Sequence, residues 1–202
     1  MKNEHQTNPA ITKKAKELYQ QHKYDECLIE LKSLASERPD NLIIQLYIAT
    51  VKFAQNQYED SIKSCHEIIN QASLKNNYHV LYMAFLIIGN AYYYHENTAK
   101  AFGYYEKALD IVIDHPSIIT DKDLYEIHIQ KIEQIINDAV KTKLEPLQLA
   151  QLYMLANQNP SALTQLQQCN GSDYVRYLSM HIHCKSGNNK QAKRFIKNLK
   201  RI

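Results

Sequence analysis

The chain has 202 residues, a formal net charge of +3, four glycines, five prolines and 15 tyrosines but no tryptophan. A charge this close to zero gives no overall attraction to nucleic acid or to a membrane surface. So few glycines and prolines exclude the many turns of an all-β protein, and they favour a helical fold.

Six helices are predicted in the first 116 residues, where apolar residues recur at helical spacing between short polar segments. Their expected ranges are 9–21, 24–37, 42–55, 58–72, 78–94 and 98–114. Packing residues recur at fixed offsets, in the sets Ala15, Cys27, Leu31 and Leu34, then Ala49, Ser61, Cys65 and Ile68, then Gly89, Ala101, Tyr105 and Ala108. The first two sets lie 34 residues apart and the next two 40 apart, so the segment is a repeat with an insertion near residues 73–77.

The clearest copy of this pattern lies in residues 81–116. Its first helix places Phe85, Ile88, Gly89 and Tyr92 on one face. Because glycine has no Cβ, a second helix can cross closely over Gly89. The pattern resembles a tetratricopeptide repeat, which is a hairpin of two antiparallel helices. The resemblance implies an all-α fold, a right-handed α-α superhelix of about eleven helices.

The second half of the chain follows the pattern less closely. Residues 121–141 predict one helix with a broad apolar stripe, capped by Thr120 or Asp121, that matches no repeat. The offsets return at Ala150, Ala162, Leu166 and Cys169, and again at Met180, Ala192, Ile196 and Leu199. We therefore predict a single domain over residues 1–202, with repeats at 8–41, 42–75 and 81–116, the irregular helix 121–141, and degenerate repeats at 143–172 and 173–202.

Motifs that carry chemistry are missing from the sequence. The four glycines are isolated, so no phosphate-binding loop is predicted. His66 and Glu67 begin a zinc-binding H-E-x-x-H pattern, but Asn70 replaces its second histidine. His181 and His183 point to different sides of a helix and cannot easily share one ion. We expect no catalytic residue, no metal ion and no cofactor, and hence a protein that is not an enzyme.

The cellular setting follows from what the sequence lacks. The N-terminal segment has no apolar run of the kind found in signal peptides, and no segment approaches the about 18 apolar residues of a membrane span. We expect a cytoplasmic protein without a membrane span. The four cysteines, which lack C-x-x-C spacing, are then interpreted as small apolar residues and not as disulfides: Cys27, Cys65, Cys169 and Cys184.

A binding groove is the strongest functional prediction. In stacked hairpins the first helix of each repeat lines the concave surface. Helical geometry then predicts a peptide-binding groove made of Tyr47, Thr50, Phe53, Met83, Leu86, Asn90, Tyr93 and Tyr94. In relatives that bind acidic tails, the resemblance implies a lysine where this chain has Leu86, although Asn90 matches the neighbouring asparagine. An apolar or amphipathic peptide is therefore the favoured partner.

Two alternatives to an open groove remain at this point. An exposed apolar surface of this size is a liability in a soluble monomer. The wide apolar stripe of residues 121–141 could fill the groove, or a homodimer could bury it. Both alternatives would leave the groove residues without a peptide ligand.

The C-terminus has a separate charge bias. From Asp173 to Ile202 there are eight basic residues and one acidic, a net charge of +7. A basic patch is predicted on one face of the last helix, made of Lys190, Lys193, Lys197, Lys200 and Arg201. This face could simply cap the stack, or it could dock RNA, an acidic protein or anionic lipid.

The sequence thus predicts a non-enzymatic adaptor or chaperone that binds a protein or peptide partner. The alternative is a regulatory protein that senses a peptide or contacts nucleic acid through its basic C-terminal helix. The resemblance identifies a fold and leaves the biological process open, since the family serves many functions.

Overall fold

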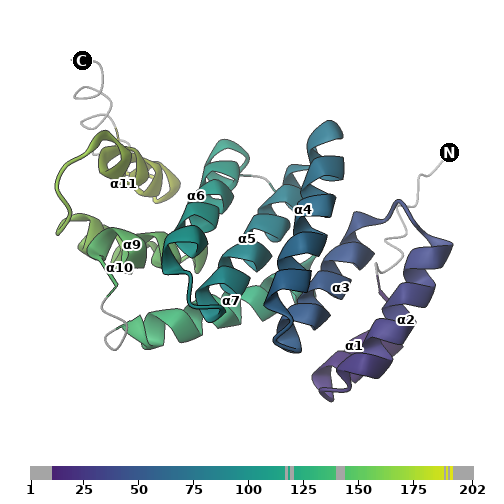
Figure 1. Ribbon diagram of the computed structural model, residues 1–202. Helices are drawn as coiled ribbons and strands as arrows, with labels where there is room; N and C mark the ends of the chain where they lie inside the picture. The colour runs from purple at the N-terminus through teal and green to yellow at the C-terminus, as the bar shows by residue number, and fades with distance from the viewer. Residues whose placement is uncertain are drawn as a thin grey trace, which may run out of the picture.

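The computed structural model describes residues 11–116, 118, 121–139, 144–188, 190 and 192. Within these residues every regular element is a helix (Figure 1), which confirms the predicted all-α fold. The ten helices described there are α1 (Lys13–Gln20), α2 (Tyr24–Glu37), α3 (Leu42–Ala54), α4 (Tyr58–Leu74), α5 (Tyr78–Tyr94), α6 (Thr98–Asp114), α7 (Lys122–Asn137), α9 (Pro146–Leu155), α10 (Asn159–Leu166) and α11 (Asp173–Lys185). None of them has the length and hydrophobicity needed to span a bilayer.

The first six helices form a row of three hairpins. Each of these helices packs against the next helix in the chain, and α3 also contacts α5 in the neighbouring hairpin. Figure 1 shows this row from purple to teal, with α9 and α10 extending it at the other end. Stacked helical hairpins of this kind are a tetratricopeptide-like solenoid, as the sequence predicted. The exact repeat boundaries stay a prediction.

One turn geometry recurs at the ends of six helices. A single residue with positive φ stands in each turn: His22, Asn56, Asn76, Glu96, Asn157 and Gly187. The backbone N–H of the following residue donates to a carbonyl five residues earlier, as from Asn97 to Tyr92 at 2.9 Å. This is the Schellman arrangement, which satisfies the last carbonyls of a helix and turns the chain sharply. The polar segments within the hairpins are therefore turns of one kind, whereas the links that follow α2 and α6 are not.

These turns lead to a prediction at Glu96, whose φ is 57°. A side chain in the left-handed region is strained, and glycine is not. We expect Glu96→Gly to raise the free energy of unfolding by about 0.5 to 1 kcal/mol, after allowing for the greater freedom of glycine in the unfolded chain. Chemical denaturation measures this change. Asn76→Gly is the control, since asparagine already tolerates positive φ, and a gain at Asn76 equal to that at Glu96 would contradict the explanation.

Helices α5 and α6 cross closely at Gly89. A Cβ atom built there would stand 2.5 Å from Cε1 and 2.6 Å from Cδ1 of Tyr105, both far inside van der Waals contact. The Tyr105 ring is fully buried between α5 and α6. The predicted close approach over Gly89 is therefore confirmed, and its partner is the ring of Tyr105.

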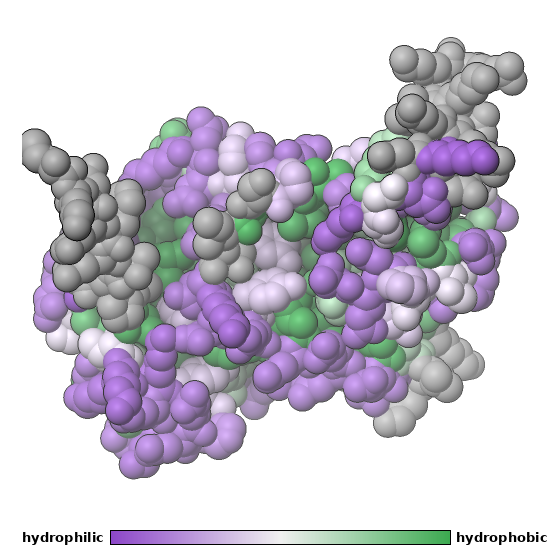
Figure 2. Space-filling view, turned by 180° about the vertical axis from the view of Figure 1, so that it is seen from behind, coloured by the Kyte–Doolittle hydropathy of each residue, from purple (hydrophilic) through white to green (hydrophobic). Residues whose placement is uncertain are grey.

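The face of the molecule that Figure 2 shows, seen from behind, is mostly hydrophilic, and its apolar residues appear as separate patches among polar ones. Among the described residues, the large apolar side chains that are exposed are Ile29, Leu74 and Tyr78. These lie on different helices, α2, α4 and α5. Single exposed apolar residues are normal in soluble proteins.

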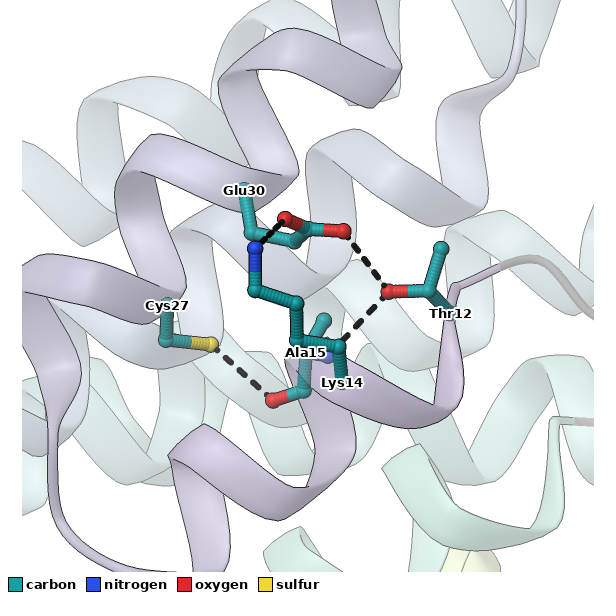
Figure 3. A network of polar contacts seen from close by, with 5 residues as sticks. All are labelled: Thr12, Lys14, Ala15, Cys27 and Glu30. Carbon is teal, nitrogen blue, oxygen red and sulfur yellow. Dashed lines mark hydrogen bonds and ion pairs between the residues drawn. The ribbon is translucent and has the colours of Figure 1, made fainter.

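Polar contacts join the two helices of the first hairpin (Figure 3). The Glu30 carboxylate accepts a bond from Lys14 Nζ at 2.8 Å and one from Thr12 Oγ1 at 3.0 Å. Thr12 also caps α1 by accepting the N–H of Ala15. The Cys27 thiol donates to the Ala15 carbonyl at 3.3 Å, and burial raises the pKa of this thiol to about 11. Cys27 is therefore a packed, protonated thiol, as the sequence indicated.

Candidate protein-binding cleft

The inner surface of the row is occupied by α7. Figure 1 shows α7 running crosswise to the helices of the hairpins. It packs against α5 and α9, and its side chains also reach α1 and α3. Leu124, Ile132 and Ile135 are its buried apolar residues. Asp121, one of the two predicted caps, caps the start of the helix, and its side chain accepts the N–H of Leu124 at 3.1 Å.

This position of α7 decides where the predicted groove residues lie. Six of the eight are buried, namely Tyr47, Thr50, Phe53, Met83, Leu86 and Asn90, and the other two, Tyr93 and Tyr94, are half-buried. An open groove along all eight positions is not what the structure has. Five of them contact α7 or its cap residue Asp121, namely Tyr47, Thr50, Phe53, Asn90 and Tyr94. The apolar stripe of α7 is wide because this helix contacts several first helices at once, α1, α3 and α5.

Polar contacts hold both ends of α7. The hydroxyl of Tyr47 donates to Asp121 Oδ1 at 2.6 Å, and Lys16 on α1 forms an ion pair with Asp123. Towards the other end, the hydroxyl of Tyr94 donates to Gln134 Oε1 at 3.1 Å. Two of the predicted groove residues, Tyr47 and Tyr94, therefore hold α7 in place through their hydroxyl groups. Burial and the neighbouring Asp121 both raise the pKa of Tyr47, so its phenol stays protonated.

A chain of buried hydrogen bonds lies beneath the middle of α7. His128 Nε2 lies 3.0 Å from Thr50 Oγ1, and His128 Nδ1 lies 3.2 Å from Asn90 Nδ2. Asn90 Nδ2 also donates to the His128 carbonyl at 3.1 Å, and Asn90 Oδ1 accepts from the Tyr105 hydroxyl at 2.8 Å. Thr50 donates in turn to the Leu46 carbonyl at 2.9 Å. These hydrogen bonds join α3, α5, α6 and α7, so Asn90 is a packing residue in this structure.

A cleft lies open between α7 and the first hairpin. It has a volume of about 360 Å³, at the lower end of the range of small-molecule pockets. Its floor is made by buried residues of α2 and α3, among them Leu31, Tyr47 and Val51. One rim is α1, with Lys16, Tyr19 and Gln20, and the other is α7, with Asp123, Glu126, Ile127 and Gln130. We call this space the α1–α7 cleft.

The cleft continues into a second hollow of about 260 Å³ that shares Tyr19, His22, Ile127 and Gln130 with it. Aromatic residues from four helix ends line this hollow: Tyr24, Phe53, Tyr58 and Tyr94. Lys131 lies at its edge, 5.9 Å from the centre of the Tyr94 ring. Three predicted groove residues, Tyr47, Phe53 and Tyr94, therefore line the space that α7 leaves open.

Sequence reasoning missed the rim residues Tyr19, Gln20, Ile127 and Gln130. Their role depends on where α7 lies, and no repeat offset predicts that position. One signal was available, since residues 123, 126, 127 and 130 recur at helical spacing on a single face of the predicted helix 121–141.

Two other sequence predictions concern the second half of the chain. In the basic patch, Lys190 is an exposed residue, while Lys193, Lys197, Lys200 and Arg201 lie outside the described residues. The role of that patch therefore stays a prediction. In the part of the chain that the structure describes, no three His, Cys, Asp or Glu side chains are grouped as metal ligands.

Comparison with solved structures finds helical repeat proteins. One is the complex of the TPR2AB domain of yeast Sti1 with pHSP90, with a TM-score of 0.45 and 14% identity, covering 91% of this chain and 85% of that chain. Another is a tetratricopeptide repeat protein from Parabacteroides merdae ATCC 43184, with a TM-score of 0.39 and 16% identity, covering 91% of this chain and 74% of that one. No protein-family model matches the sequence, and no curated protein matches it either.

Proposed function

We propose that the protein is a non-enzymatic adaptor or chaperone of the cytoplasm that binds a segment of a partner protein in the α1–α7 cleft. The observation that carries this proposal is the cleft itself, whose buried apolar floor lies between two polar helix rims. Concave sites with an apolar lining and a few polar groups are the usual form of binding sites.

The shape and the rims of the cleft favour an extended segment. A helix with its side chains is about 10–12 Å across, and the space between α1 and α7 is crossed by the Lys16–Asp123 ion pair. Gln20 and Gln130 face the cleft from opposite rims, and among the described residues neither side chain has a hydrogen-bond partner. Each amide offers a donor and an acceptor, which the backbone of an extended peptide can satisfy.

The aromatic hollow adds a preference for the partner's side chains. Half-buried tyrosine rings give large contact areas with little loss of side-chain freedom, and such residues often dominate binding energy. Among the described residues, Lys131 has no carboxylate partner; it donates to Gln134 Oε1 at 3.3 Å. An apolar or aromatic side chain on the Tyr24–Tyr58 side, with an acidic residue beside Lys131, would therefore fit the hollow best.

A pair of matched variants tests this proposal. Ile127→Asp places a charge at the rim of the cleft, whereas Ile29→Asp makes the same change at an isoleucine on α2 that is 71% exposed. We expect Ile127→Asp to reduce capture of partners from native lysate, with nuclease present, by at least about tenfold, because a buried interface residue is commonly worth about 1 to 2 kcal/mol. Ile29→Asp should capture partners as the wild type does.

Circular dichroism of both variants shows whether they fold. Equal capture by the two folded variants would place the binding site elsewhere on the protein. A photo-crosslinking residue at position 130 then gives an independent test, since it should attach to the captured partner.

A further inference from the structure

The hydrogen bonds around His128 require a neutral imidazole. Asn90 cannot be turned around, because its Nδ2 donates to the His128 carbonyl and its Oδ1 accepts from Tyr105. Asn90 Nδ2 therefore donates to His128 Nδ1, which must carry no proton. Nε2 then carries the single proton and donates to Thr50. A second proton, on Nδ1, would set two donors against each other in a site that water does not reach.

We propose that docking of α7 on the inner surface is coupled to the protonation of His128, so that mild acid weakens the docking of the helix that forms one rim of the α1–α7 cleft. The coupling between α7 docking and His128 protonation is inferred from the geometry around His128. The effect of that coupling on partner binding rests on the proposed function above.

The groups that face His128 from every side support this coupling. On α3 they are Thr50 and the ring of Phe53, 5.7 Å away between ring centres, and on α5 Asn90. From α6 the neutral phenol of Tyr105 lies behind Asn90. The charged group that acts on the imidazole is Lys131 on α7 itself, and its positive charge opposes protonation.

Two further helices touch α7 away from His128. The contact with α1 is the Lys16–Asp123 ion pair, and the contact with α9 includes the bond from the Tyr125 hydroxyl to the Leu155 carbonyl. Neither brings a carboxylate to the imidazole. Nothing in these contacts would stabilise a charged His128 while α7 is docked.

The direction of the pH effect follows from these contacts. Burial, with Lys131, lowers the pKa of His128 from 6.5 to about 3 while α7 is docked. Once α7 is released, the imidazole is in water and titrates near its ordinary value. The released form then binds the proton more tightly, so docking is at full strength above pH 6.5 and weakens about tenfold for each unit of pH below it, down to about pH 3.

Hydrogen exchange of the full chain tests the coupling. Exchange of α7 amides, corrected for the intrinsic effect of pH, is compared with that of α5 and α6 amides at pH 7, 6 and 5. We expect α7 to lose about 20-fold in protection between pH 7 and pH 5, with a smaller loss in α5 and α6. Unchanged protection of α7, or an equal loss in all three helices, would overturn the proposal.

Two variants assign the effect to one side chain. Glutamine at position 128 can accept from Asn90 and donate to Thr50 without titrating, so His128→Gln should abolish the pH dependence of α7 protection. His181→Gln, a histidine on α11 whose pKa burial also lowers, should retain it. The same pH dependence in His128→Gln as in the wild type would contradict the proposal.

A direct titration decides the question if His128→Gln does not fold. In wild-type protein with labelled histidine, nuclear magnetic resonance should find His128 neutral, with its proton on Nε2, at pH values where α7 is docked. A pKa near 6.5 for docked His128 would overturn the proposal. Neither measurement uses partner capture, so failure here is distinct from failure of the proposed function.

Discussion

Replacing Gly89 by leucine is expected to lower the free energy of unfolding by about 3 kcal/mol, among the largest effects of any single change. Even the first added atom, the Cβ, would stand 2.5 Å from the ring of Tyr105. That ring cannot move aside easily, because its hydroxyl donates to Asn90 and its edge packs against Phe102 with 5.4 Å between ring centres. The bulk of leucine would therefore force α5 and α6 apart. Denaturant unfolding measures the loss.

Gly103 provides a matched control in the neighbouring helix. A Cβ there meets no atom within 4 Å, and the residue is exposed in α6. Gly103→Ala should therefore stabilise the protein by up to about 1 kcal/mol, through helix propensity alone. Combining Gly89→Ala with Tyr105→Leu tests the contact directly, since the two changes should cost less together than the sum of their separate effects. An unchanged stability in Gly89→Leu would show that the two helices do not cross there.

The double variant Tyr47→Ala with Tyr93→Ala is expected to destabilise the fold by about 3 to 5 kcal/mol. Tyr47 is only 3% exposed, and its hydroxyl holds the first turn of α7 through Asp121. Tyr93 is half-buried and packs edge-on against Tyr94 with 5.9 Å between ring centres. If these rings instead lined an empty groove, their removal would barely change the melting temperature. Thermal unfolding therefore distinguishes a filled inner surface from an open one.

Two further variants separate packing from hydrogen bonding in this result. Tyr47→Phe removes only the bond to Asp121 and should cost about 1 to 3 kcal/mol, as expected for a bond to a charged group. Tyr78→Ala removes a tyrosine that is 38% exposed and should cost less than Tyr47→Ala. A double variant that melts with the wild type would mean that α7 does not cover these rings in solution.

The hairpins could be predicted from the sequence because their signals are local. The recurrence of Ala49 and Gly89 at equivalent positions fixes which faces of the first helices pack. Ala49 is fully buried, and Gly89 is in close contact with Tyr105 on the next helix, as that recurrence implies. Each hairpin is formed by residues near one another in the chain, so periodicity and turn residues contain most of the information needed.

The site could not be predicted in the same way, because it depends on contacts between distant residues. His128 meets Thr50, 78 positions earlier in the chain, and Tyr47 meets Asp121, 74 positions later. The inner-surface positions of Phe53 and Asn90 follow from helical geometry, but their partners do not. An inward-facing apolar residue gives the same sequence pattern whether it binds a ligand or packs against an internal helix. Phe53, whose ring centre lies 5.7 Å from that of His128 on α7, is an example of the second case.

The crosswise position of α7 also has a consequence for the protein while it is being made. At about 5 to 20 residues per second, roughly three to fourteen seconds separate the synthesis of Phe53 from that of Asp121. During that interval the nascent chain contains the inner-surface residues Tyr47 and Phe53 without the segment that contacts them, Asp121 and α7. Apolar surface exposed on a growing chain is a substrate for chaperones and a site of aggregation. We therefore expect ribosome-bound chains whose part outside the ribosome ends shortly before residue 121 to engage chaperones more strongly than chains whose outside part extends past residue 139.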